Sequence, residues 1–117
     1  MGMIDGAYDE EVLIDDDVRL ALNNRLLAIE GITSAPLFGG VGYLVDGQPF
    51  AVLLEGVVGM RLPECLQRRA YGLAGVSRLR PPSWNDPVPD WQQFVLLLPE
   101  DVPELEPWLF EAVENVR

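Results

Sequence analysis

The residues of this chain that could do chemistry are mostly arginines, and they are concentrated in one segment. Five of the eight basic residues fall between positions 61 and 80, where Glu64 is the only acid. That segment carries +4, and because the whole chain carries −11, the remainder carries −15. Exposed guanidinium groups bind carboxylates and phosphates, so the segment predicts a basic binding surface unless nearby acids pair with it. The five are Arg61, Arg68, Arg69, Arg78 and Arg80.

Cys65 offers a second kind of chemistry. It lies near the expected start of a helix, with Arg68 and Arg69 close in sequence, and this setting favours the reactive thiolate. A catalytic or redox thiol also needs a base or a resolving partner, yet the chain has no histidine and no second cysteine. The same lack leaves a zinc site without its usual ligands. We therefore expect no catalytic residue, no metal and no cofactor, and we interpret Cys65 as a small side chain that is partly buried and has no chemical role.

Trp84 lies in a segment that cannot form a long helix or strand. Four prolines occur within nine residues, at positions 81, 82, 87 and 89, and proline interrupts both kinds of element. An exposed tryptophan in such a loop suits a binding hot spot, but it could equally fold back over the sheet. Together with the five arginines, Trp84 completes the candidate interaction surface.

Residues 37–63 are typical of three short strands, and they organise the expected fold. Asp46-Gly47 between two apolar runs is a strong hairpin signal, and Glu55-Gly56 predicts a second turn. Alternation places Phe50, Val52 and Leu54 on one face. We expect that one face of this antiparallel sheet is core and that the other is at least half exposed.

The glycines at the start of this stretch resemble a phosphate cradle only superficially. Such a cradle places glycines between a strand and the N-terminus of a helix, with the amides aimed at the anion. Here Gly39, Gly40 and Gly42 lead into a strand, and no Gly-Lys-Ser or Gly-Lys-Thr follows. Glycine in a strand more often marks a bulge or a close approach of another backbone, such as the first helix. We therefore interpret these glycines as structural.

Helices are expected on either side of the strands. Asp15, Asp16 and Asp17 are typical of a capped helix start, and the periodic apolar residues that follow predict a helix over 16–30. Further helices are expected over 64–71 and 101–117, with Pro107 in the first turn of the last one or after a separate turn. Short strands are expected over 76–80 and 91–98. The result is one α+β domain over 15–117, built on a single antiparallel sheet, after an acidic, flexible leader over 1–14.

The stretch from Ser34 to Arg61 also resembles the N-terminal domain family of TfoX, a regulator of natural competence also called Sxy. It contains FGGVG, the hairpin Y-x-V-D-G-x-x-F-A and a basic residue that closes the third strand, while F-V-L-L-L-P-E-D-V and the helix with Trp108 resemble the closing part of the family. The likeness covers roughly residues 17–116, although Leu37 and Arg61 stand where members often have Met and Lys. It implies an α+β fold and transcriptional regulation through protein contacts, with no catalytic residue. The residues that carry the signature are Phe38, Gly39, Gly40, Gly42, Asp46, Gly47 and Phe50.

The sequence favours a non-catalytic regulatory or protein-interaction module. A nucleic-acid-binding module that uses the arginines of segment 61–80 is the first alternative, although the net charge disfavours it; a small enzyme that uses the Cys65 thiol is the second. The apolar runs are too short to span a bilayer, and the acidic N-terminal residues lack the basic end and apolar run of a signal peptide. We expect a cytoplasmic protein that binds another protein, and a homodimer through a strand edge or sheet face is compatible with the sequence.

Overall fold

The computed structural model describes residues 13–82 and 84–117, which form a six-stranded antiparallel sheet and three α-helices. The α+β class expected from the sequence is thereby confirmed. The strands lie in the order β1-β2-β3-β4-β6-β5. In chain order the elements are α1 (Asp16–Leu26), β1 (Ile32–Leu37), β2 (Gly40–Val45), β3 (Gln48–Leu54), β4 (Val57–Met60), α2 (Glu64–Tyr71), β5 (Ser77–Arg78), β6 (Gln92–Val95), the 3-10 turn η3 (Pro99–Asp101) and α3 (Val102–Val116).

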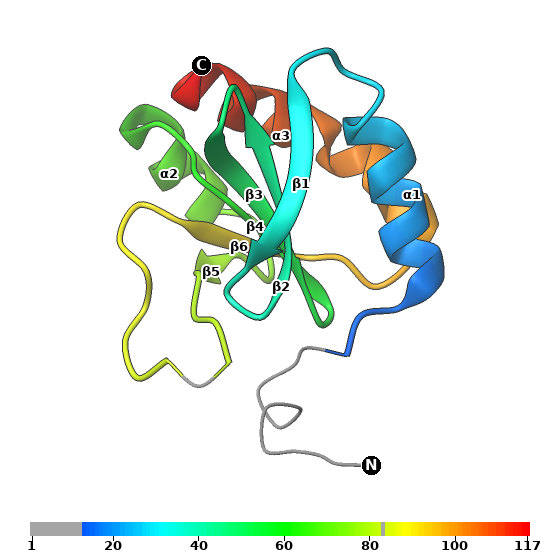
Figure 1. The fold of residues 1–117 in the computed structure, drawn as a ribbon. Coiled ribbons are helices and arrows are strands. Elements are labelled where there is room, and N and C mark those ends of the chain that lie inside the picture. The colour runs from blue at the N-terminus through cyan, green and yellow to red at the C-terminus, as the bar shows by residue number, and fades with distance from the viewer. Residues whose placement is uncertain (1–12, 83) are drawn as a thin grey trace.

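The three helices pack on a common side of the sheet. Figure 1 shows α1 beside the beginning of α3, and α2 beside the later turns of α3. All three contribute to one apolar cluster, the main core, which they form with the strands. Its largest fully buried members are Leu22, Leu26, Tyr43, Phe50, Leu53, Met60, Leu62, Leu96 and Leu109.

Two-residue turns join the first four strands into a meander. The expected hairpin at Asp46-Gly47 is confirmed, with φ of 52° and 83°, and so is the turn at Glu55-Gly56, where Gly56 has a φ of 73°. Another turn, at Phe38-Gly39, has φ of 53° and 84° and precedes β2. Positive φ at both central residues is the geometry that suits the twist of a tight hairpin. The FGGVG glycines therefore begin in a hairpin turn.

The strand that this turn closes, β1, was not expected from the sequence. Residues 32–36 all pair with β2. The Asp46 amide donates to the Gly31 carbonyl at 3.1 Å, so by alternation Ser34 and Pro36 turn their backbone groups towards the open edge. Pro36 has no N–H to offer there, and the other edge strand, β5, has only two residues. Neither edge favours pairing with a second copy.

The side of the sheet opposite the helices is buried at its centre, which corrects the expectation of a half-exposed face there, while Val95 and residues 33–36 stay exposed. Val52, Leu54, Leu79 and Trp91 form a second buried cluster, the minor core, on the side opposite the helices. The loop between β5 and β6 supplies its cover. Leu79 anchors this loop through two backbone hydrogen bonds, because its amide donates to the Trp91 carbonyl at 3.0 Å and its carbonyl accepts from the Val88 amide at 2.8 Å.

A β-bulge changes the face on which Phe50 lies. The β2–β3 register runs from Tyr43 opposite Ala51 to Leu44 opposite Pro49, which leaves Phe50 as the extra residue. Bulged residues break the strict alternation of side chains. Phe50 therefore packs in the main core beside Ala51, and not with Val52 in the minor core as the alternation predicted.

The helix boundaries differ from the expected ones at two points. Asp15 caps α1 as expected, because its carboxylate accepts from the amides of Asp17 (2.9 Å) and Val18 (3.1 Å), but α1 ends at Leu26 and gives way to tighter turns before Gly31. Pro107 lies inside α3 and not in its first turn, although η3 does precede the helix. Pro103 and Pro107 are both exposed, so the Pro103 carbonyl that loses its helical donor is open to water.

The glycines of β2 are required by neighbouring strands and not by the first helix. A Cβ added to Gly40 would lie 2.1 Å from the Leu53 carbonyl oxygen, and one added to Gly42 would lie 2.7 Å from the Leu37 Cβ. Real Cβ atoms do not approach backbone oxygen so closely. This close packing of strands accounts for the FGGVG sequence.

We predict that Gly40→Ala lowers the free energy of unfolding by about 3 kcal/mol or more, because the backbone of β3 must move. Gly47→Ala is the matched control: its added Cβ meets nothing within 4 Å, so it carries only the cost of a left-handed alanine, about 1–2 kcal/mol. Urea unfolding followed by tryptophan fluorescence measures both. Equal losses would show that steric contact with β3 is not what requires glycine at position 40.

Tyr43 gives the fold a dependence on alkaline pH. It is fully buried, its hydroxyl donates to Asn23 Oδ1, and burial raises its pKa from the ordinary 10.0 to about 12, with the Arg19 charge lowering it in part. The folded state thus favours the neutral phenol. The contribution of the Tyr43 hydroxyl to the free energy of unfolding is therefore complete below pH 10 and is lost as the pH rises from 10 to 12. We predict a loss of about 2–3 kcal/mol over that window. Urea midpoints should show the step in wild type and Tyr71→Phe but not in Tyr43→Phe.

Candidate interaction surface around helix α2

The five arginines of segment 61–80 are all exposed and make no ion pair within the described residues. The carboxylates that do pair with arginine serve residues outside the segment: Asp16 with Arg19 (3.1 Å), Glu106 with Arg25 (2.7 Å) and Glu114 with Arg117 (3.6 Å). Of the two interpretations that the sequence left open, the structure favours free arginines over arginines neutralised by local acids.

Three of these arginines lie around one side of α2. Arg78 stands opposite Gln92 in the register of β5 and β6, which turns its side chain to the helix-covered side of the sheet. Arg61 lies between β4 and α2, and Arg68 lies on α2 itself, within one helical turn of Glu64 and Tyr71. Residues three and four apart are neighbours on a helix surface. Arg61, Arg68 and Arg78 therefore reach this region from the β4–α2 connection, from α2 and from β5, respectively.

A polar groove runs between α2 and residues 87–90 of the proline-rich loop; we call it the α2 groove. It consists of two hollows of about 330 and 340 Å³. Gln67 and Asp90 line both hollows, so the two hollows lie side by side. Arg78 lines one hollow and Arg61 lines the other. The remaining lining residues are Leu62, Pro63, Glu64, Tyr71, Pro87, Val88, Pro89 and Asn115.

The other members of the predicted surface lie apart from this groove. Arg69 points into a shallow hollow between α2 and α3, which Trp108 and Glu111 also line. Arg80 follows β5 and lines neither hollow of the α2 groove. The charge cluster that is continuous in sequence is thus divided in space.

Trp84 is part of the cover of the minor core. Its ring meets the edge of Phe38 at a centroid distance of 5.3 Å, and Phe38 in turn meets Trp91 at 5.8 Å. Such edge-to-face contacts stabilise aromatic clusters. Trp84 therefore folds back over the sheet, which is one of the two interpretations that the sequence left open. About half of its surface, 47%, stays exposed to solvent.

Amide side chains that the sequence analysis missed hold the groove in place. Gln92 is only 1% exposed; its Oε1 accepts from the Leu62 amide at 3.4 Å and its Nε2 donates to the Tyr71 hydroxyl at 3.1 Å. Asn115 Nδ2 donates to the Arg61 carbonyl at 2.9 Å, and Gln67 Nε2 donates to the Leu62 carbonyl at 3.0 Å. The signal in the sequence was the Gln92-Gln93 pair at the start of an apolar strand, because a buried glutamine needs partners for its amide.

On the opposite face of the sheet, the Gln93 side chain likewise forms a hydrogen bond with the backbone of a neighbouring segment. Its Oε1 accepts from the Arg80 amide at 3.2 Å. Successive residues of β6 therefore bond to opposite sides, Gln92 to the wall of the α2 groove and Gln93 to the loop that covers the minor core. The backbones that carry Arg61 and Arg80 are held by these hydrogen bonds, while their side chains are exposed and form no ion pair with a described carboxylate.

The remaining candidates for chemistry are not assembled into a reactive site. Cys65 is exposed and not partly buried as expected, and the described residues contain no group of three or more His, Cys, Asp or Glu side chains that could hold a metal. Gly39 and Gly40 occupy a hairpin turn and the start of a strand, so their amides do not form the cradle at a helix N-terminus that binds phosphate. Among the described helices, none has the length and apolarity needed to cross a membrane.

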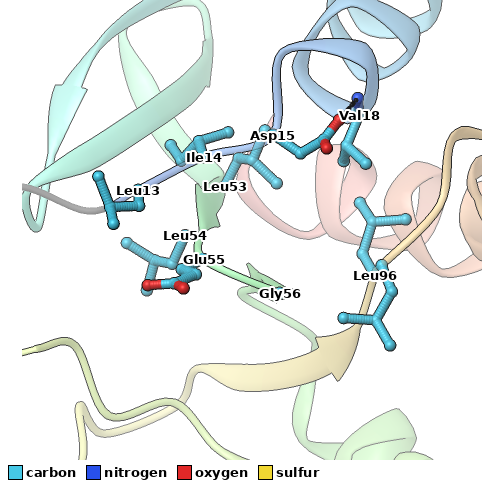
Figure 2. Close-up of a pocket in the computed structure, with 10 residues that line it drawn as sticks. Leu13, Ile14, Asp15, Val18, Leu53, Leu54, Glu55, Gly56 and Leu96 are labelled. Atoms are coloured by element: carbon cyan, nitrogen blue, oxygen red, sulfur yellow. Dashed lines mark hydrogen bonds between the residues drawn. The ribbon is translucent and has the colours of Figure 1, made fainter.

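Another hollow lies at the far end of the sheet and has a different character. Figure 2 shows residues that line it: Leu13, Ile14, Asp15 and Val18 come from the start of the described chain and α1, and Leu53, Leu54, Glu55, Gly56 and Leu96 come from β3, the turn after it and the segment after β6. Its volume is about 400 Å³. Asp15, its other acid, already caps α1 through two hydrogen bonds. The hollow offers apolar contact and no arginine.

Comparison with known proteins adds no relative. No protein-family description matches the chain, and no curated protein matches it at a significant level. The resemblance to the TfoX N-terminal domain family therefore stays a prediction that rests on the residues alone.

We predict that Gln92→Leu lowers the free energy of unfolding by about 1–3 kcal/mol, because the Leu62 amide and the Tyr71 hydroxyl lose a buried partner. Helix α2, which forms a wall of the groove, should then open more often, so hydrogen exchange of its backbone amides should become faster relative to those of β2 and β3. Gln93→Leu, on the opposite face of the same strand, is the control and should leave α2 protected. Unchanged exchange in α2 would show that Gln92 does not position this helix.

Proposed function

We propose that the chain is a non-catalytic regulatory module that binds an acidic partner protein through the arginines of segment 61–80. The observation that carries this proposal is that all five are exposed while no carboxylate in the described residues pairs with them. Unpaired guanidinium groups are the residues of choice for recognising carboxylates in an interface. The resemblance to the TfoX N-terminal domain family supports a regulatory role that links this binding to transcription or competence.

The electrostatics of the whole chain favour a protein partner over a nucleic acid. The segment carries +4 on a body of −15, and affinity for nucleic acid rests on many phosphate contacts along an extended backbone. A polyanion that runs past the patch meets the acidic body, whereas a protein can present a few carboxylates to the patch alone. Nucleic-acid binding remains the second candidate, because the same free arginines would serve it.

A thiol-dependent activity is the remaining alternative. Cys65 lies in the first turn of α2 and is exposed, but it belongs to no group of three or more His, Cys, Asp or Glu side chains in the described residues that could hold a metal. Cys65→Ala would separate this alternative from the proposal, because the thiol contributes nothing to recognition of carboxylates. The proposal requires that Cys65→Ala binds its partner as wild type does.

The test removes charge without removing bulk. Immobilised wild type should retain from a lysate of its native cells a protein that the five-arginine variant (Arg61→Gln, Arg68→Gln, Arg69→Gln, Arg78→Gln, Arg80→Gln) does not retain. Arg19→Gln/Arg117→Gln is the control, because its exposed ion pairs contribute little to stability and lie outside the segment. Equal retention by all three forms would refute the proposal, and retention that nuclease treatment abolishes would favour the nucleic-acid candidate.

A further inference from the structure

We propose that the α2 groove binds an extended segment of the partner protein that carries carboxylates near its two ends and uncharged residues between them. This inference rests on the proposed function and specifies where, and in what form, the partner is recognised. Its basis is the placement of Arg78 and Arg61 in two adjacent hollows that share Gln67 and Asp90 as lining residues.

The walls of the groove have the composition that suits a peptide chain. On one side α2 presents Glu64, Gln67 and Tyr71, which share a face of the helix by their spacing of three and four residues. On the other side Pro87, Val88 and Pro89 supply apolar surface. Tyrosine and proline offer contact area that loses little side-chain freedom on binding. Side chains of a bound segment can pack against these residues, an option that a phosphodiester backbone lacks.

The acids in the groove determine where the partner's charges belong. Asp90 lines both hollows and so lies between the two arginines, while Glu64 lines the end near Arg61. A carboxylate in the middle of the bound segment would face Asp90 and be repelled, since like charges at short range are unfavourable. A uniformly charged polyanion therefore fits less well than a segment whose charges are separated.

The groove is preorganised for such a segment. Asn115 holds the Arg61 carbonyl, Gln67 holds the Leu62 carbonyl, and buried Gln92 holds the Tyr71 hydroxyl. Asp90 has a left-handed backbone, with a φ of 68°, which few non-glycine residues adopt and which the surrounding structure must enforce. Because these groups are already ordered, binding does not have to order them, and less affinity is lost to ordering.

The test compares two pairs of arginines from the same segment. Arg61→Gln/Arg78→Gln removes the two ends of the groove, and Arg69→Gln/Arg80→Gln removes the same charge outside it. The probe is a fluorescein-labelled peptide series in which two glutamates flank an uncharged spacer of increasing length. Fluorescence anisotropy at low ionic strength measures the affinity, and urea midpoints confirm that both variants are folded.

We expect an optimal spacer length, a loss of about tenfold or more in affinity for the groove pair, and little change for the off-groove pair. Replacing the spacer by glutamates should weaken binding, and amide shifts on titration should include Gln67, Tyr71 and Asp90. Equal losses for the two pairs, no dependence on spacer length, or tighter binding of a single-stranded oligonucleotide would overturn the inference.

The two proposals fail in distinguishable ways. If the off-groove pair abolishes binding and the groove pair does not, the arginines still recognise an acidic partner but the α2 groove is not the site. If neither pair nor the five-arginine variant changes the affinity for a peptide that binds wild type, the arginine surface itself is excluded, and the proposed function falls with the groove.

Discussion

The burial of β3 on both faces is the constraint on which the rest of the structure depends. Ala51 and Leu53 face the helices, whereas Val52 and Leu54 face the opposite side, and all of them are almost completely buried. The three helices cover only one side of the sheet, so the second side needs a cover of its own. The loop between β5 and β6 provides it, since Leu79, Val88 and Trp91 pack there with Phe38 from the first hairpin turn. That task fixes the course of the loop, and its end at residues 87–90 becomes the wall that faces α2.

Parts of the fold follow from local sequence, and the failures have identifiable causes. The turns at Asp46-Gly47 and Glu55-Gly56 were predicted, because few residues other than glycine tolerate a positive φ, whereas the turn at Phe38-Gly39 was not. β1 was missed because residues 33–36 are exposed at the edge of the sheet and so show no apolar alternation. The covered second face could have been inferred, because the run Phe50–Leu54 has no polar residue and strands buried on both faces read as continuous apolar runs. The face on which Phe50 lies could not have been inferred, since a bulge depends on how two strands pair.

The candidate site shows the same division between local and non-local information. The count of arginines pointed to α2 and its neighbours, but only the register of β5 and β6 places Arg78 on the side of α2. The hydrogen bonds that hold the groove join residues 21 (Gln92 with Tyr71), 30 (Gln92 with Leu62) and 54 (Asn115 with Arg61) positions apart. No periodicity in the sequence encodes such pairs. Trp84 was a candidate for the same surface, yet the need to cover the minor core directs it to Phe38 on the other face.

Charge on this chain acts in opposite directions at long and short range. At low salt, where electrostatic interactions extend to about 30 Å, an approaching acidic partner is repelled by the net charge of −11. Attraction begins only where carboxylates come within reach of arginines that no described acid neutralises. An acidic globular surface that approaches broadly would bring most of its charge against the acidic body. A narrow segment that projects from its own domain keeps the two bodies apart while its carboxylates reach the groove, so the charge distribution itself selects an extended partner over a flat one.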